Sequence, residues 1–321
     1  MNTILVTGAA GFIGAAVSAA LLARGDHVIG IDNLNSYYDV TLKQARLARL
    51  TSRPGFAFHQ IDISRHEAVL ELAAPDISHI VHLAAQPGVR YSLENPYAYV
   101  TANVMGQIVM LELARAMPKL RHFVYASSSS VYGANQKTPF AVGDAVDHPN
   151  SLYAATKRAD ELFGHTYAHL YGIPSTGLRF FTVYGPWGRP DMAPILFAKA
   201  ITAGKPIKVF NNGEMWRDFT YIDDIVDGVL KALDHPPAAK PPHALYNLGN
   251  NRSEKLTDFI AAIEQALGRK AVMEMAPMQP GDVPATCADI EASRRDLGFQ
   301  PTTPISAGIP KFINWFRDYY R

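Results

Sequence analysis

Three glycines near the start of the chain restrict what its amino-terminal part can fold into. Gly8, Gly11 and Gly14 follow the apolar run 4–7 at three-residue spacing and open a stretch with helical spacing. Gly8 allows a tight turn, Gly11 a close approach of backbone to ligand, and Gly14 close packing of helix on strand. The helix N-terminus offers free N–H groups and partial positive charge, which suit the pyrophosphate of a dinucleotide. The alternative is a glycine-rich turn without a ligand.

An acidic residue at the end of the next strand supports the dinucleotide interpretation. The apolar run 27–32 closes with Asp32 about 20 residues beyond the glycines, where an acid meets the ribose in this kind of site. A carboxylate there accepts hydrogen bonds from the adenosine ribose and repels a 2′-phosphate, so the sequence favours NAD over NADP. Phe12, Ile13 and Asn33 stand beside these positions and are further candidates for cofactor contact.

Two later strand ends add candidates, each with an alternative. Asp62 and Ile63 follow the expected strand 56–61. The Asp62 carboxylate could reach the adenine amino group, or it could cap the following helix. Another strand ends in Leu83, Ala84 and Ala85. These mostly small side chains suit a close approach to the nicotinamide ribose, or simply tight packing.

Strands alternate with helices over the first half of the chain. We expect strands at 4–7, 27–32, 56–61, 79–85, 122–127 and 176–181, and helices at 12–24, 42–50, 65–74, 97–117 and 151–170. This alternation implies parallel pairing with right-handed crossovers. The predicted fold class is therefore α/β, with a Rossmann-like doubly wound parallel sheet in residues 1–181.

The pattern changes after Phe181. The loop 185–190 is rich in turn residues, and the elements beyond it are shorter. We expect helices at 194–203, 254–267 and 305–319, and strands near 207–210, 219–221 and 245–248. Residues 182–321 are interpreted mainly as a smaller α/β substrate-binding domain. Segments near 219–249, namely 219–221 and 245–248, are expected to return to the first sheet.

Tyr153 and Lys157 lie four residues apart on the expected helix 151–170. Residues at this spacing share a helix face, with Cβ atoms about 5–6 Å apart. The lysine charge favours the ionised phenol, and a bound nicotinamide cation would add to that effect. A phenol acidified in this way can move a proton beside a nicotinamide, so we predict hydride chemistry. The alternative is a tyrosine that belongs to the core or to an interface.

Composition excludes several classes of function. The 321 residues carry a formal net charge of +1 without a concentration of Lys and Arg, so we expect neither nucleic acid nor an anionic membrane as partner. The single Cys287 excludes an internal disulfide and fits a reducing cytosol. The apolar stretch 4–23 has no Lys or Arg before it and contains three glycines, so we expect a soluble cytoplasmic protein instead of a signal peptide or membrane span.

Four motifs carry a family resemblance. They are TGAAGFIG at 7–14, HLAA at 82–85, SSSSVYG at 127–133 and YAATK at 153–157. Over nearly the whole chain, the sequence resembles the extended short-chain dehydrogenase/reductases that act on nucleotide sugars. The segments IDNLNSYYD at 31–39, FTVYGPWGRPD at 181–191 and MQPGDVPAT at 278–286 are similar to the UDP-glucuronate 4-epimerases within that family.

The resemblance implies NAD-dependent interconversion of UDP-glucuronate and UDP-galacturonate through a transient 4-ketone, without a metal. Tyr153 would take the proton of the sugar 4-hydroxyl while hydride leaves C4, Lys157 would hold the cofactor ribose, and Ser128 would bridge the phenol and the 4-oxygen. Related dehydratases carry Asp and Glu at this strand end, and decarboxylases carry Glu at the position of Ser130. Ser129 and Ser130 cannot act as acid or base near neutrality, which disfavours both reactions.

A 4-keto uronate is a β-keto acid, which loses carbon dioxide readily when its carboxylate bond aligns with the ketone. An epimerase must therefore restrain that carboxylate. We expect the planar guanidinium of Arg189 to do so, together with hydroxyl donors from Thr182, Ser129 and Ser130. The alternative for Arg189 is a solvated loop arginine.

For the UDP half, the resemblance assigns Arg217 to the pyrophosphate and Asp282 to the uridine ribose. Arg90 is a weaker candidate for the phosphates, and a surface salt bridge would explain it as well. Two other functions stay open at this point, a 4-epimerase of neutral UDP-sugars and a non-catalytic NAD-binding protein. Family members commonly form homodimers through helices that correspond to 97–117 and 151–170.

Overall fold

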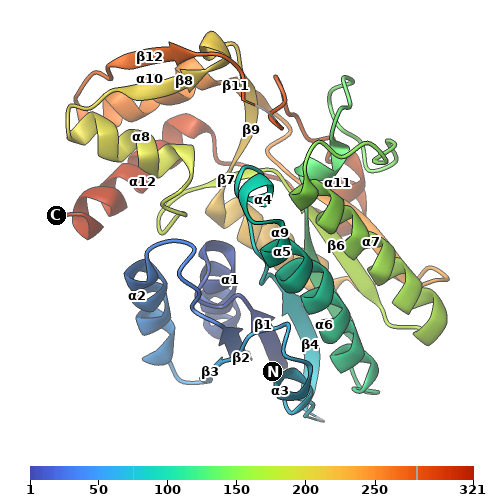
Figure 1. The fold of residues 1–321 in the computed structure, drawn as a ribbon. Coiled ribbons are helices and arrows are strands. Elements are labelled where there is room, and N and C mark those ends of the chain that lie inside the picture. Colours follow the sequence, from blue (N-terminus) through green and yellow to red (C-terminus); the bar gives the residue numbers. More distant parts are fainter. Residues whose placement is uncertain (75, 280) are drawn as a thin grey trace.

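The computed structural model describes residues 1–74, 76–279 and 281–321 and is built around one seven-stranded sheet (Figure 1). Across the sheet the strands are β10 (His243–Leu248), β6 (Ser175–Phe180), β5 (His122–Ser128), β4 (Ile77–His82), β1 (Thr3–Thr7), β2 (His27–Asp32) and β3 (Phe56–Gln60). Each neighbouring pair is parallel. The predicted α/β class with a Rossmann-like doubly wound sheet is confirmed.

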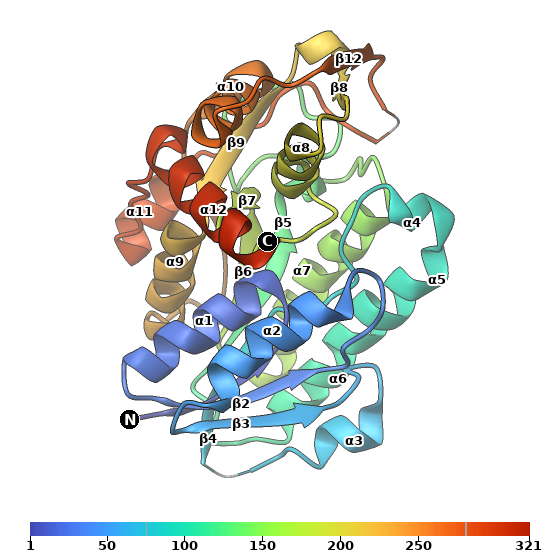
Figure 2. The same cartoon turned by 90° about the vertical axis from the view of Figure 1, so that its left-hand side faces the viewer.

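The central strands are apolar because helices cover both faces of the sheet. Ile4, Leu5 and Val6 of β1 have no exposed surface. One face is covered by α1 (Phe12–Ala23), α2 (Val40–Thr51) and α9 (Ile222–Asp234), and the other by α3 (His66–Leu70), α6 (Gly106–Arg115) and α7 (Leu152–Tyr171) (Figures 1 and 2). The strand order reverses between β1 and β4. Ligands of such sheets bind beside this reversal, at the carboxyl ends of the strands.

Elements from the second half of the chain form a smaller unit at the top of Figure 1. It contains a sheet of β11 (Ser253–Lys255), β9 (Trp216–Tyr221) and β7 (Thr182–Tyr184), a pair of β12 (Met273–Ala276) and β8 (Ile207–Phe210), and the helices α8 (Ala193–Thr202), α10 (Leu256–Leu267) and α12 (Ile305–Tyr319). Its apolar core is separate from the clusters that flank the large sheet. In that core the rings of Phe219 and Phe259 stack with centroids 3.9 Å apart.

Of the two segments expected to return to the first sheet, one does so. The segment 245–248 lies in β10, which pairs with β6 as predicted. The prediction for 219–221 is wrong, because these residues belong to β9, which pairs with β7 and β11. The free edge of β6 is already occupied by β10, so β9 has no strand of the large sheet left beside it there.

The helix expected at 97–117 is interrupted. It consists of α5 (Pro96–Tyr99), a π-helical stretch η1 (Val100–Met105) and α6. The widened turn carries Asn103, whose side chain accepts from the Gln86 amide (2.7 Å) and donates to the Thr156 hydroxyl (3.0 Å). π-helical turns are frequent at functional sites. The bond from Asn103 to Thr156 joins η1 to α7, the helix that carries Tyr153.

The sequence pattern does not predict α9 or α11 (Glu291–Leu297). Helix α9 follows β9 without an intervening residue, so no glycine or proline marks its start. Helix α11 has seven residues, too few for a clear apolar period. Both boundaries are set by packing, with α9 against the large sheet and α11 against β10.

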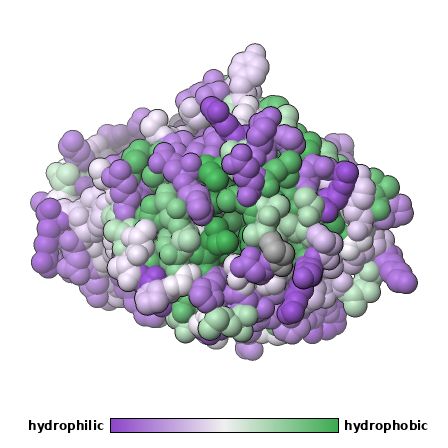
Figure 3. Space-filling view, turned by 90° about the horizontal axis from the view of Figure 1, so that it is seen from below, coloured by the Kyte–Doolittle hydropathy of each residue, from purple (hydrophilic) through white to green (hydrophobic). Residues whose placement is uncertain are grey.

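The face at the bottom of Figure 1 is drawn in Figure 3. Hydrophobic residues gather near the middle of this face, and hydrophilic residues surround them. Within the described ranges, none of the helices combines the length and the apolar character that crossing a membrane requires.

Candidate active site

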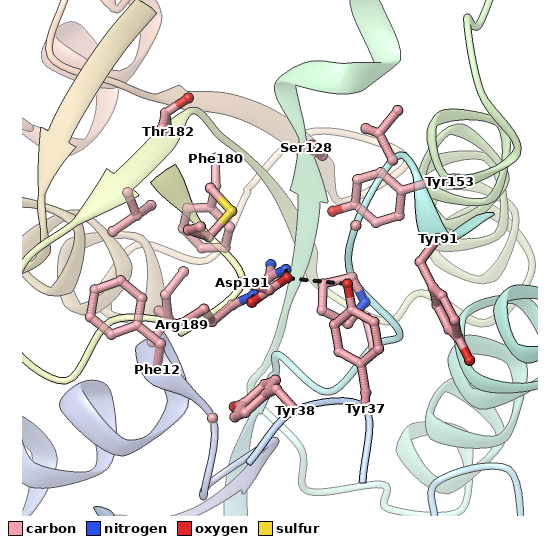
Figure 4. Close-up of a pocket in the computed structure, with 18 of the residues that line it drawn as sticks. Phe12, Tyr37, Tyr38, Tyr91, Ser128, Tyr153, Phe180, Thr182, Arg189 and Asp191 are labelled. Carbon is pink, nitrogen blue, oxygen red and sulfur yellow. Dashed lines mark hydrogen bonds and ion pairs between the residues drawn. The ribbon is translucent and has the colours of Figure 1, made fainter. Parts of the chain in front are cut away.

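A cavity of about 1080 Å³ lies between the carboxyl ends of the large sheet and the smaller unit (Figure 4). Its lining includes every site residue predicted from the sequence. These are Gly8, Gly11, Phe12, Ile13, Gly14, Asp32, Asn33, Asp62, Ile63, Leu83, Ala84, Ala85, Arg90, Ser128, Ser129, Ser130, Tyr153, Lys157, Thr182, Arg189, Arg217 and Asp282. The fold therefore brings the predicted cofactor and sugar residues to one place, and their individual roles stay predictions.

The glycine loop has the geometry that a pyrophosphate requires. Gly8 has a φ of +69°, and the Gly11 amide donates to its carbonyl at 2.8 Å. A Cβ at Gly14 would lie 2.1 Å from the Gly8 oxygen, and one at Gly11 would lie 2.9 Å from it. The loop therefore excludes side chains at these positions and leaves backbone against the cavity at the start of α1. These residues fit a bound dinucleotide.

The two predicted acids of the cofactor end are held in place by neighbouring groups. Asp32 accepts from the Ala10 amide (3.2 Å) and the Leu34 amide (2.8 Å). Asp62 accepts from Asn33 (2.9 Å) and from the amide and hydroxyl of Ser64. Burial raises the pKa of Asp62, but the hydrogen bonds outweigh it and hold the pKa below its usual value. Asp62 closes a turn before α3 and is not the cap residue of that helix.

The end of β4 packs directly against the glycine loop. The Thr7 hydroxyl accepts from the amides of Leu83 (3.1 Å) and Ala84 (2.9 Å). A Cβ at Gly8 would meet the Ala84 amide nitrogen at 2.9 Å. Tight packing thus accounts for the small residues here. The same residues also line the cavity, so the predicted contact with a nicotinamide ribose is compatible with this packing.

Tyr153 and Lys157 lie on the first turns of α7, as expected. Ser151 caps the helix by accepting from the Ala154 amide (3.1 Å). The Tyr153 ring lies edge-on to Tyr99, with centroids 6.1 Å apart, and its hydroxyl points into the cavity (Figure 4). The Lys157 ammonium is buried and donates to the Ala126 carbonyl at 2.9 Å. The phenol therefore faces the ligand space, and Lys157 lines the same cavity.

The serine run turns out of β5 at the edge of the cavity. Ser128 ends the strand and caps a short 3₁₀ turn, η2 (Ser129–Tyr132), by accepting from the Ser130 amide (3.1 Å) and donating to the Ser130 hydroxyl (3.1 Å). Ser127 points the other way and donates to Glu161 at 2.6 Å. The cavity therefore meets hydroxyls, and no carboxylate, at this strand end.

Arg189 is paired within its own loop. Its Nε donates to Asp191 Oδ1 at 3.1 Å, and its Nη2 donates to Oδ2 of the same carboxylate, which also accepts from Tyr37 (3.1 Å) (Figure 4). Burial raises the pKa of Asp191, but the Arg189 charge outweighs this effect and lowers it overall. Arg189 is thus not a solvated loop arginine. Its Nη1 is the part of the fork that Asp191 does not occupy.

Three supporting residues were missed by sequence reasoning. Asp191 and Tyr37 fix the Arg189 guanidinium, and the acid two residues after the arginine was a usable signal. Arg46 on α2 is fully buried and donates to the carbonyls of Trp187 (2.7 Å), Gly188 (2.9 Å) and Ala10 (3.2 Å). It ties the loop of Arg189 to the glycine loop, and nothing in its sequence context marks it.

The cations predicted for the UDP half also line the cavity, and Arg217 does so from β9 of the smaller unit. Arg217 donates to the carbonyls of Trp216 (2.9 Å) and Pro284 (3.2 Å), and burial lowers its pKa. Arg90 and Asp282 form an ion pair at 3.4 Å with both residues on the lining. The salt bridge proposed as the alternative for Arg90 is therefore present, and it joins the two residues predicted for the phosphates and the uridine ribose.

Taken together, a glycine loop that fits a dinucleotide, a tyrosine–lysine pair and several arginines line one cavity. The chain belongs to the NAD dependent epimerase/dehydratase family, whose model matches residues 4–249. It is 49% identical to UDP-glucuronate 4-epimerase 4 of Arabidopsis thaliana, over 99% of this chain and 76% of that protein. It is 45% identical to the probable UDP-glucuronate 4-epimerase of Rhizobium meliloti, over 99% of this chain and 97% of that one.

A solved structure agrees with the sequence relatives. The UDP-glucuronic acid 4-epimerase of Bacillus cereus, determined in complex with UDP-glucuronic acid and NAD, superposes with a TM-score of 0.93. It is 35% identical, and the match covers 99% of this chain and 100% of the other. The family and the fold predicted from the motifs are confirmed.

Proposed function

We propose that this protein is an NAD-dependent UDP-glucuronate 4-epimerase, which interconverts UDP-glucuronate and UDP-galacturonate. The observation that carries the proposal is that Tyr153, Lys157 and Arg189 line the same cavity as the glycine loop. The full-length similarity to UDP-glucuronate 4-epimerases supports it. In this proposal residues 1–181 mainly hold the cofactor, with the return strand β10, and residues 182–321 mainly hold the UDP-sugar.

The residues of this chain divide the chemistry among them. When bound, NAD supplies the hydride acceptor and donor for the sugar C4. Tyr153 removes the proton of the 4-hydroxyl and returns it after the 4-ketone has turned over. Lys157 keeps the phenol acidic, and Ser128 donates to the 4-oxygen. Because the hydride and the proton both return to the sugar, the reaction has no net redox change.

The same cavity disfavours decarboxylation of the ketone. The strand end beside Tyr153 offers Ser129 and Ser130, which cannot supply a proton near neutrality, and Thr182 adds a third hydroxyl. Arg189 presents its remaining donors to the uronate carboxylate from a loop fixed by Arg46 and Asp191. A carboxylate held by these groups is kept out of alignment with the ketone.

The direct test is proton NMR of the purified protein with UDP-glucuronate and no added reductant. We expect UDP-galacturonate to accumulate to an equilibrium mixture without a pentose product. A UDP-pentose as the main product would assign the protein as a decarboxylase. Absence of any product from UDP-glucuronate, with turnover of UDP-glucose, would assign a neutral-sugar epimerase.

Arg189→Ala separates the uronate function from general epimerisation. We expect kcat/KM for UDP-glucuronate to fall by roughly 100-fold, because the substrate carboxylate loses a cation and meets the uncompensated charge of Asp191. Any turnover of UDP-glucose serves as the control and should change less than threefold, since that sugar carries no carboxylate. Equal losses on both substrates would refute the carboxylate clamp.

We further propose a cytoplasmic homodimer. Apolar side chains are exposed on α5, η1 and α7, where Tyr97 is 81% exposed and Val100, Met105 and Leu162 are about half exposed. A second copy packing on these helices would cover them. Sedimentation velocity should give twice the chain mass of 35.2 kDa, and Leu162→Glu should shift it toward the monomer. A monomeric parent protein would contradict this assignment.

A further inference from the structure

Lys157 forms a buried ion pair with a second charged residue, Asp160, which has no role in the proposed reaction. Asp160 lies one turn further along α7, and its Oδ2 accepts from the Lys157 ammonium at 3.0 Å. The side chains are 4% and 2% exposed, so the pair is almost completely withdrawn from solvent. An ammonium has three protons, and the Ala126 carbonyl and Asp160 engage two of them. One proton is left for the cavity, and its direction is set by the other two.

The second oxygen of the same carboxylate is not engaged by Lys157. Asp160 Oδ1 is buried without a hydrogen-bond partner among the described residues, and so is Gln107 Nε2 on α6. Both helices run back between parallel strands, so they are parallel to each other (Figure 1). Asn103 donates to Thr156 across this interface. Gln107 and Asp160 each lie four residues further on, so a donor and an acceptor that both lack a partner among the described residues lie about one turn further along these two helices.

Burial of the carboxylate has an electrostatic consequence. Burial raises the pKa of Asp160 to about 6, with Lys157 acting in the opposite direction and Glu161 adding to it. At neutral pH the carboxylate is therefore mostly ionised and offsets part of the lysine charge. A negative charge beside Lys157 weakens the positive potential at Tyr153, four residues before the lysine.

We propose that Asp160 is a positioning residue that fixes the Lys157 ammonium and limits its effect on Tyr153, with Gln107 bound to its free oxygen through one buried water molecule. A water between one donor and one acceptor on facing helices would satisfy both groups. The inference rests on the proposed function in taking Tyr153 as the proton carrier. Loss of Asp160 should leave the lysine charge uncompensated, so the phenol should titrate at lower pH.

The other titratable groups around Lys157 and Asp160 do not change their charge near neutral pH, so they would not produce the same shift of Tyr153. The groups that act on Lys157, Asp160 or Tyr153 are His82 on β4, Tyr125 on β5, Tyr99 on α5, Arg189 in its loop and Glu161 on α7. Arg179 on β6 and Arg158 on α7 are bonded to Glu161. Burial lowers the pKa of His82 to about 3, and burial raises those of Tyr99 and Tyr125. Glu161 is bonded to Arg179.

The test follows the Tyr153 phenol directly by carbon NMR of ¹³Cζ-tyrosine in the NAD-loaded protein without substrate. Among the 15 tyrosines, the Tyr153 signal is the one lost in Tyr153→Phe. We expect Asp160→Asn to move its titration midpoint down by about one pH unit. The acidic half-maximum of the epimerisation rate should move the same way. Because UDP-glucuronate is absent from the NMR measurement, failure of the proposed function would not obscure its result.

A matched control is Asp218→Asn. Asp218 is an equally buried aspartate whose pKa burial also raises to about 6, but it bonds Thr220 and the amides of Asn250 and Ala288 instead of Lys157. Asp218→Asn should leave the titration midpoint of Tyr153 within about 0.2 pH units of the parent protein's value. An unchanged or raised midpoint in Asp160→Asn would overturn the proposal, as would an equal shift in both variants.

If Asp160→Asn does not fold, Gln107→Leu carries the test. Removing the donor to Oδ1 disfavours the ionised carboxylate, so it should shift the Tyr153 midpoint in the same direction by a smaller amount. Absence of a shift in the folded Gln107→Leu protein would overturn the proposal, because the proposed bond to Oδ1 would then have no effect on the Asp160 charge. A shift to higher pH would overturn the role of Asp160 itself.

Discussion

Tyr153→Phe should reduce the rate of C4 epimerisation by roughly 10³-fold while leaving the fold intact. The hydroxyl points into the cavity, whereas the ring packs edge-on to Tyr99 and is retained by phenylalanine (Figure 4). Proton transfer by a positioned side chain contributes about 10²–10⁴-fold to a rate. Turnover of UDP-glucuronate followed by NMR measures the loss, and NAD retained through gel filtration reports the integrity of the site.

Tyr99→Phe is the control for that experiment. It removes a buried hydroxyl that lies within hydrogen-bond distance of the Pro87 and Gly88 carbonyls, where its single proton is shared between them and is not offered to the ligand space. It should retain activity within about tenfold. Unchanged turnover in Tyr153→Phe would show that the reaction does not use this proton path, and the catalytic assignment would then fail.

Glu161→Ala should destabilise the protein by about 3–5 kcal/mol, the largest stability effect we expect from one side chain. Glu161 lies one residue from Asp160 and forms a two-point pair with Arg179 at 2.7 and 2.8 Å, with both side chains 1% exposed. It also accepts from Ser127 at 2.6 Å. Removing the acid leaves the Arg179 charge buried without its counter-charge. Urea unfolding of the two proteins measures the difference.

Arg158→Ala tests whether the burial of the Glu161–Arg179 pair is the reason for the loss of stability expected in Glu161→Ala. Arg158 donates to the same carboxylate at 3.1 Å, but its side chain is 28% exposed. Its removal should cost less than about 1 kcal/mol, because water replaces it. Similar losses in the two variants would mean that the Glu161–Arg179 pair is not the element that stabilises this part of the sheet.

Much of the fold followed from local signals. Alternating apolar runs and helical periods predicted the strands of the large sheet up to β6, since each run is bounded by a polar or glycine-rich turn. The partner strands of β9 could not be predicted in this way, because the sequence of a short apolar strand does not indicate which strand it pairs with. Likewise, η1 depends on Asn103 bonding across to Thr156, a contact between residues far apart in sequence.

The candidate site divides along the same line. Motif residues such as Gly14, Tyr153 and Arg189 could be predicted because they belong to motifs with fixed spacing in the sequence. They line one cavity. Their supports were not found. Arg46 and Asp160 act through neighbours brought together only by folding, so no spacing in the sequence identifies them. Asp191 is the exception, because its place two residues after Arg189 was a sequence signal that could have identified it.

Arg46 links the glycine loop to the loop of Arg189, so a displacement of one loop is expected to displace the other. Its guanidinium donates to the carbonyls of Trp187 and Gly188 on one loop and of Ala10 on the other, and none of its hydrogen bonds within the described part of the chain reaches an acidic side chain. Engineering that reshapes α2 to accept a different nucleotide should therefore also displace the loop of Arg189, which we propose binds the sugar carboxylate. Under the proposed function, we therefore expect that cofactor preference can be changed without a change in sugar preference only if the hydrogen bonds of Arg46 are rebuilt.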